Sequence, residues 1–291
     1  MSKTKILTTV LIVFVLLFGG AFLLNHANFF SNGEPTDSNK GSGKAAQNIA
    51  ANGEASLGEQ ESDVKEEPEE KGLKDFTDGI WIKKYPENYA CFKFETPEGI
   101  KIVADPYMMD EIVEPDIVTE SHQHSDHTDV SKLQGTYKLI KETGEYDEKG
   151  IKINGYSGKH NKGDTAETNI IFTYVINGIK IAHFASQGEL PSDETLEKIK
   201  NADVLLVQAS IKPEYANSKM NLEETKHIID KLNPKIVIPE HGSENLGKAL
   251  AAYLNLKVEF VKKGEIVVTR SELDASKGLR VLDIDTDVPK D

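Results

Sequence analysis

Hydrophobic residues between positions 73 and 119 fall in short runs separated by polar residues, a pattern typical of β-strands. The runs predict strands at Ile80–Lys83, Ala90–Phe94, Ile100–Ala104 and Ile117–Thr119. A hairpin is predicted farther along, where the runs Asn169–Ile176 and Lys180–Phe184 are joined by Asn177-Gly178. Asn-Gly is a favoured two-residue hairpin turn, so these two strands are expected to pair.

From residue 192 onward, helical patterns alternate with strand patterns. Helices are predicted at Ser192–Asn201, from Asn221 to Pro234, and at Ser243–Leu254; Asn221 and Glu224 have the spacing of a capping box. The intervening and following strands are expected at Val204–Gln208, Ile236–Ile238, Val258–Phe260 and Ile266–Val268. Early strand meanders followed by β-α-β units predict an α/β sandwich with helices covering the sheets from outside.

The N-terminus carries a membrane signal. Ile6 to Leu24 is an uninterrupted run of 19 apolar or small residues, which as a helix is roughly 28 Å long. Lys3 and Lys5 precede it and place the N-terminus in the cytoplasm, so the rest of the chain is expected outside. Residues 1–30 are either an uncleaved membrane anchor or a signal segment removed after export. The length of the run, and Asn25 at the best cleavage position, favour the anchor.

Composition divides the rest of the chain in two. Residues 31–72 are rich in Gly, Ser, Asn, Glu and Lys and have almost no large apolar side chains, which predicts a flexible acidic linker. Residues 73–291 are expected to form one globular domain.

Charge and cysteine content narrow the function. The 34 basic and 48 acidic residues give a net charge of −14, which argues against a nucleic-acid partner because the phosphate backbone is itself negative. The single cysteine, Cys91, lies in a predicted strand and is expected to be a buried, inert thiol. A small molecule is the expected substrate, and the oligomeric state stays open.

The segment that carries chemistry follows the apolar pair Ile117-Val118. Its pattern is His-x-His-x-Asp-His, formed by His122, His124, Asp126 and His127. A loop that leaves a strand end can direct all four side chains into one pocket. Imidazole and carboxylate are the ligands that suit Zn²⁺ and similar ions, with Mn or Fe as alternatives. The competing interpretation is a solvated loop that happens to be rich in histidine.

At this motif the chain resembles the metallo-β-lactamase fold hydrolases, because His122–His127 matches their signature without a gap. The order of the later motifs is most similar to the branch that includes ascorbate phosphate lactonase and related predicted zinc hydrolases. Asp105-Pro106 resembles an early element of that branch, His160 its next ligand, and His183 the start of its His-x-Gly-Asp element. The segment Ile238–Gly242 resembles its terminal ligand motif, which ends in His241-Gly242.

The resemblance covers roughly residues 79–264 and implies an αβ/βα sandwich of two mixed β-sheets covered by helices. It also implies one metal held by His122, His124 and His160, and a second held by Asp126, His127 and His241. The residues themselves add that His160 is expected in a loop rich in Gly and Lys, and that His241 lies just past a strand end. Both are positions from which a side chain reaches a pocket at a sheet edge.

One position departs from the family pattern. Ser186 stands where the family usually has an aspartate that bridges the two metals, and a hydroxyl is a poor ligand at neutral pH. Three outcomes stay open: a site with two metals, a site with one tight and one weak metal, or a binding protein that has lost catalysis. Glu189 and Glu240 are candidates for a substitute carboxylate, although an exposed or supporting position is the simpler expectation for each.

The expected function is a metal-dependent hydrolase, with one or two zinc ions, that acts on an ester, lactone, amide or phosphoester. Zinc lowers the pKa of a bound water from about 15.7 toward about 7, which supplies a hydroxide nucleophile. Asp126 is expected to orient that water, and Asp105 to support the ring of a ligand histidine. The alternative is a non-catalytic metal-binding or scaffold module in which Ser186 marks a degenerate site.

Overall fold

The computed structural model describes residues 77–85, 89–166, 168–215, 217–241, 245–261 and 264–284. The predicted membrane segment, residues 1–30, and the predicted linker, residues 31–72, lie outside these ranges. Within them, no helix has both the length and the apolar character needed to cross a bilayer.

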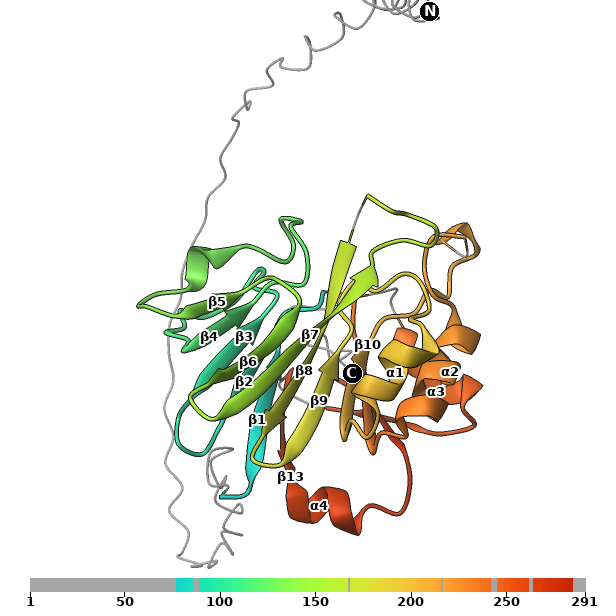
Figure 1. Cartoon of the computed structure of the whole chain (residues 1–291). Helices are drawn as coiled ribbons and strands as arrows, with labels where there is room; N and C mark the ends of the chain where they lie inside the picture. Colours follow the sequence, from blue (N-terminus) through green and yellow to red (C-terminus); the bar gives the residue numbers. More distant parts are fainter. Residues whose placement is uncertain are drawn as a thin grey trace, which may run out of the picture. The chain divides into compact units, whose positions relative to one another are not determined.

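A six-stranded sheet forms one layer of the fold (Figure 1). In the order β13-β1-β2-β3-β4-β5, its strands are Glu265–Thr269, Gly79–Lys84, Phe92–Glu95, Lys101–Ala104, Ile117–Thr119 and Lys138–Ile140. Strands β13, β1, β2 and β3 pair antiparallel, whereas β3, β4 and β5 are parallel. The segment with the histidine motif therefore leaves the sheet at the carboxyl end of β4.

An eight-stranded sheet faces it. In the order β12-β14-β11-β10-β9-β8-β7-β6, its strands are Val258–Phe260, Arg280–Asp283, Ile236–Pro239, Val204–Val207, Ile179–His183, Thr168–Ile176, Ile151–Lys159 and Gly144–Glu148. The meander β6 to β9 is antiparallel. From β9 onward all pairs are parallel, so β9, β10 and β11 end at the same edge.

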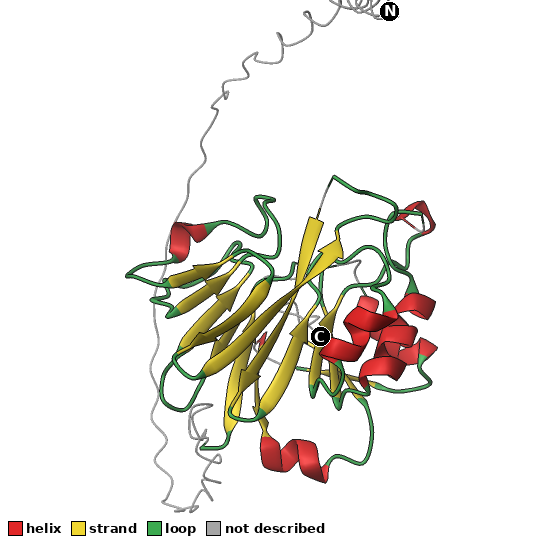
Figure 2. Cartoon of the chain, in the orientation of Figure 1, coloured by secondary structure: helices red, strands yellow, loops and turns green. Residues whose placement is uncertain are grey.

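The helices gather mainly on one side of the molecule, as Figure 2 shows. They are α1 (Asp193–Ile199), α2 (Leu222–Leu232), α3 (Leu246–Tyr253) and α4 (Arg270–Ala275), with the short 3-10 turns η1 (Val130–Lys132) and η2 (Pro213–Tyr215). Apolar residues of α1, α2 and α3, among them Leu196, Ile228 and Leu250, pack on the outer face of the eight-stranded sheet. This burial fixes the parallel strands β9, β10 and β11, whose ends carry the loops of the site.

The main core lies between the two sheets. Phe92, Phe94 and Ile117 of the first sheet and Phe172 and Leu206 of the second belong to one buried cluster. Successive side chains of a strand point to opposite faces of the sheet, so every second residue of each strand points into this layer. The fold is a sandwich of two mixed sheets with helices, as expected.

Helices were predicted to cover the outer face of the six-stranded sheet, but a loop covers it. Within the described ranges, Cys91 and Val103 on this face pack against Met109 and Val113 of the β3–β4 connection, and not against a long helix. The buried thiol of Cys91 agrees with its expected inert role, and burial raises its pKa. Helical cover is therefore confirmed for the eight-stranded sheet, and a packed loop replaces it on the other.

Elements with strong local signals lie where the sequence predicts them. Strand β4 has the predicted bounds, and Asn177 and Gly178 join β8 and β9 with φ angles of 49° and 74°. Helix α2 begins after Asn221 with both hydrogen bonds of a capping box to Glu224. Each signal depends on residues within four positions of one another.

Strands β5, β6, β7 and β14 and helix α4 were not predicted from the sequence. The largest omission is β7, because its two glycines make it resemble a loop. Gly158 is needed for close approach: a Cβ there would overlap Oε1 of Gln187. His160 lies in a loop before β8, as expected, and this loop begins directly after β7.

Candidate metal centre

Loops from four strand ends supply the predicted site residues. The segment after β4 carries His122, His124, Asp126 and His127, and His160 follows β7. Residue Ser186 lies after β9, and His241 comes two residues after the end of β11. Strand ends from both sheets therefore contribute to one cluster of side chains.

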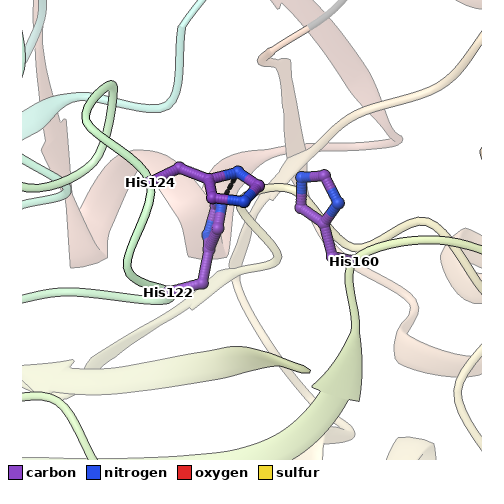
Figure 3. A group of neighbouring side chains, drawn as sticks. All are labelled: His122, His124 and His160. Carbon is purple, nitrogen blue, oxygen red and sulfur yellow. Dashed lines mark hydrogen bonds between the residues drawn. The ribbon is translucent and has the colours of Figure 1, made fainter. Parts of the chain in front are cut away.

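The first ligand group consists of His122, His124 and His160. One nitrogen of each ring lies within 4.8 Å of the other two. His122 Nε2 is 3.1 Å from His124 Nδ1, and the His160 ring centroid is 4.8 Å and 4.7 Å from those of His122 and His124. Figure 3 shows the three rings turned toward one another. Zn–N bonds of about 2.0–2.1 Å need ligand nitrogens that are only a few ångströms apart, so the set fits such an ion.

The second ligand group consists of Asp126, His127 and His241. Asp126 Oδ2 lies 3.8 Å from His127 Nε2 and 3.9 Å from His241 Nε2, and the two histidine rings are 5.3 Å apart. His122 adjoins this group, because one ligand atom each of His122, Asp126 and His127 also lies within 4.8 Å of the others. The structure thus brings all six predicted residues into one cluster.

Burial sets the protonation of His122. It lowers the pKa of this ring to about 2, and the neighbouring His127 adds to the effect. The ring is therefore neutral at pH 7. Neutral imidazole is the form that donates a lone pair to a metal, so the electrostatics agree with the donor geometry.

Asp105 supports His127 from below, as the sequence analysis expected. Its Oδ2 lies 3.0 Å from His127 Nδ1, and its Oδ1 accepts a hydrogen bond of 2.6 Å from the backbone N–H of Ser121. Burial by itself would raise the pKa of Asp105, but the histidines His127 and His183 outweigh it and lower the pKa to about 2. The carboxylate is therefore ionised and leaves His127 Nε2 to face the cluster.

Ser186 stands beside the second ligand group. Its Oγ lies 3.1 Å from His127 Nε2, at the place where the resemblance puts the missing aspartate. Together with Asp105 this makes a line of serine, histidine and aspartate that superficially matches a nucleophilic triad. Ser186 has no exposed surface, however, so a substrate does not reach its hydroxyl. The metal-ligand interpretation of His127 explains the arrangement better.

The two glutamates considered as substitutes have different surroundings. Glu189 pairs with Lys159 at 2.7 Å and accepts a hydrogen bond from the backbone of Gly163. Glu240 is buried, accepts a hydrogen bond of 2.8 Å from the N–H of Ala185, and lies 2.9 Å from His183 Nε2. Both glutamates are therefore paired with other protein groups, in agreement with the expectation of an exposed or supporting position.

Ser121 was not predicted as a contributor, and His183 was named only as the start of a family element, without a role. Ser121 Oγ lies 3.0 Å from His122 Nδ1, and His183 lies between Glu240 and Asp105. The available signals were the position of Ser121 next to His122 and the position of His183 at the very end of a buried strand. Neither signal distinguishes a supporting side chain from an ordinary buried one.

Comparison with known proteins agrees with the fold. A family described as "Beta-lactamase superfamily domain" matches residues 87–241. This range contains the whole ligand cluster, from the histidine motif to His241. Among curated proteins, none matches the chain.

Solved structures share the architecture. A proposed Zn-dependent hydrolase of the metallo-beta-lactamase superfamily from Thermotoga maritima aligns with 70% of this chain and 98% of its own, at 27% identity and a TM-score of 0.56. Igni18, a metallo hydrolase from Ignicoccus hospitalis, aligns with 65% of this chain and 98% of its own, at 14% identity and a TM-score of 0.50. CmlA, a diiron beta-hydroxylase from Streptomyces venezuelae, aligns with 67% of this chain and 55% of its own, at 9% identity and a TM-score of 0.51. The last two show a shared fold alone, on which different metal chemistries are found.

Proposed function

The chain belongs to the beta-lactamase superfamily, and from this premise we propose that it is a zinc-dependent hydrolase of a small molecule that contains an ester, lactone, amide or phosphoester. The observation that carries the proposal is the convergence of five imidazoles and one carboxylate from three separate stretches of the chain. Nitrogen and carboxylate oxygen are the donors that zinc takes in catalytic sites.

The two ligand groups have distinct roles in this proposal. The first group would hold one ion through three imidazoles, and the second would hold another through Asp126, His127 and His241. Bound zinc lowers the pKa of a coordinated water toward about 7 and polarises a carbonyl or phosphoryl oxygen. Manganese or iron would suit the same donors less specifically.

Asp126 is the residue that we propose to act on the proton. Its carboxylate is partly exposed, unlike the buried His127 beside it, so it faces both the cluster and the solvent. From this position it orients a water molecule by accepting a hydrogen bond, and it accepts the proton when the water attacks. Asp105 is buried below the cluster and would hold His127 in one orientation.

The proposal is tested on the purified full-length chain in two steps. Elemental analysis measures the metal bound per chain, and a panel of generic esters, lactones, amides and phosphodiesters is assayed before and after removal of metal by a chelator. We expect at least one metal per chain and hydrolysis of one class that is lost with the chelator and restored by Zn²⁺. His124→Ala is the matched variant, because it removes one ligand of the first group.

The second candidate function is non-catalytic metal binding, and Ser186 is the observation that favours it. A neutral hydroxyl adds no negative charge between two dications. Stoichiometric metal with no turnover on any substrate class would favour this alternative. A chain that binds no metal, or hydrolysis that the chelator leaves unchanged, contradicts the zinc-dependent hydrolase.

We also propose that Ile6–Leu24 anchors the chain in a membrane and places the domain outside the cytoplasm, or that it directs secretion if it is cleaved. The support is the length of the apolar run and the two preceding lysines. Carbonate extraction of membranes from expressing cells, followed by protease treatment of intact cells, tests it. A chain found in the carbonate-soluble fraction inside the cell would contradict both forms.

A further inference from the structure

The buried side chain of His183 lies among the loops that follow β3, β9 and β11. It has no assigned part in the proposed chemistry. His183 is the last residue of β9 and has no exposed surface. Its Nε2 lies 2.9 Å from Glu240 Oε2 and 3.8 Å from Asp105 Oδ2. A histidine between two buried carboxylates is unusual in an apolar core, because isolated charges are costly to bury.

Each carboxylate continues to a residue of the second ligand group. The other contact of Asp105 Oδ2 is His127 Nδ1 at 3.0 Å, and Glu240 directly precedes His241 in the chain. The second oxygen of Glu240 accepts a hydrogen bond from the N–H of Ala185, next to Ser186. His183 therefore connects the loops after β3, β9 and β11.

The backbone of these loops is strained at the same places. Asp105, Ala185 and His241 have φ angles of 48°, 51° and 37°, a region that residues other than glycine rarely adopt. A strained backbone conformation persists only where several surrounding contacts hold the residue in it. All three strained residues lie in, or next to, the contacts that His183 makes.

The charges around His183 agree with a bridging role. Besides the two carboxylates, the Phe92 ring packs edge-to-face with the His183 ring, with 5.8 Å between the ring centroids. Burial by itself would lower the pKa of His183, but Glu240 and then Asp105 outweigh it and raise the pKa.

We infer that His183 is a positioning residue, which joins Asp105 to Glu240 and so holds His127 and His241 in place for the second metal but not for the first. The inference rests on the proposed metal centre for its effect on metal affinity. Its effect on the loops themselves does not need a metal. An ordinary buried histidine would instead affect both ligand groups only through overall stability.

The experiment compares the full chain with His183→Phe, which fills the space without a polar atom, and with His183→Gln, which keeps one donor and one acceptor. Thr225→Val is the matched control, because Thr225 is buried and its hydroxyl donates to the backbone oxygens of Asn221 and Gln208, not to a residue of either ligand group. Metal-free protein is titrated with Co²⁺ and then Zn²⁺, and the visible absorption and the bound metal are recorded for each equivalent.

We expect His183→Phe to weaken binding of the second ion by about 10- to 100-fold, the usual effect of losing outer support of a ligand, and to change the first by less than about threefold. His183→Gln is expected to recover part of the loss, and Thr225→Val to match the wild type. The inference is overturned if the second ion binds the phenylalanine variant within about threefold of the wild type. It is also overturned if both ions weaken equally, in proportion to a loss of thermal stability.

A second measurement needs no metal. Amide hydrogen exchange of the metal-free chain reports the peptides that contain Ser121 and Ala185, whose N–H groups donate to Asp105 and Glu240. Both should exchange at least about tenfold faster in His183→Phe and at the wild-type rate in Thr225→Val. Unchanged exchange overturns the inference. A wild type that binds no metal contradicts the proposed function, and exchange alone then decides the role of His183.

Discussion

The two ligand groups use the same kinds of side chain but have different support. In the first group, the nearest supporting atom of His122 is the neutral hydroxyl of Ser121, one residue away in the chain. In the second group, His127 and His241 depend on Asp105, His183 and Glu240, which come from three distant segments. The comparison teaches that two of the three histidines of the first group come from one local motif with a local support, whereas the supports of the second group come together only in the assembled fold.

The strongest way to break this comparison is to remove His122, which belongs to the first group and adjoins the second. His122 has a ligand atom in each of the two clusters. We expect His122→Ala to lose both metals and to lower kcat/KM by at least about 1,000-fold on any substrate that the wild type hydrolyses, because charge stabilisation by a metal contributes several kcal/mol. Elemental analysis and steady-state kinetics measure the two effects.

His227→Ala is the control for that change, because His227 is partly exposed on helix α2 and lies 3.7 Å from Asp193. It should retain metal and activity. Full metal content in His122→Ala would contradict the expected part of this ring in holding metal.

The next largest effect concerns the charged support of the second group. The pKa of Asp105 is about 2, below the ordinary value of 3.8, so its ionised form stabilises the folded state. This stabilisation is present above about pH 4 and is lost as the pH falls toward 2. We expect about 2 kcal/mol of the stability difference between wild type and Asp105→Asn to disappear over that range.

Urea unfolding of the metal-free proteins at several pH values measures this difference. Asp129→Asn serves as a comparison, because the pKa of Asp129 is also lowered, but by the hydrogen bonds with Ser131 that cap the short turn η1 and not by a histidine. A difference between wild type and Asp105→Asn that is constant from pH 5 to pH 2 would contradict the charged network.

A smaller change should sharpen the contrast between the two groups. Ser186→Asp places a carboxylate beside His127 Nε2, where it supplies negative charge to the second ion. We expect the second ion to bind about tenfold tighter, or roughly 1.4 kcal/mol, with little change for the first. The metal-free variant should be less stable than wild type, because the added charge is buried away from water.

Isothermal titration with Zn²⁺ and thermal unfolding of the metal-free variant measure the two effects. An increase in affinity for both ions, or for neither, would show that Ser186 does not face the second group alone.

The last expected effect lies behind the first group and concerns stability, not metal binding. Gly158 lies two residues before His160 in the chain, and a side chain there would displace the amide of Gln187, which bonds the backbone N–H of Lys159. We expect Gly158→Ala to reduce the free energy of unfolding by about 1–3 kcal/mol, as overpacking does. Gly278→Ala is the control, because a Cβ there meets open space. Equal stability of the two variants, measured by urea unfolding, would contradict the proposed close approach.

Much of the fold was predictable because its signals are local. Strand β4, the Asn177-Gly178 turn and the capping box at Asn221 each depend on neighbouring residues, and each lies where the sequence predicts it. Strand β7 was not predictable in the same way. Gly158 suggests a loop when the sequence is read alone. The structure shows instead that it makes room for the side chain of Gln187, which comes from a different loop.

For the site, the sequence by itself determined the donor set and the spacing of His122, His124, Asp126 and His127, because one short loop after one strand carries all four. Only the tertiary structure decided that His183 lies between Asp105 and Glu240, and that His160 directly follows a strand. The physical reason is the separation along the sequence of the residues that interact. A motif acts through adjacent peptide units, whereas a buried ionic contact among residues about 50 to 80 positions apart forms only after the sheets have packed and excluded water.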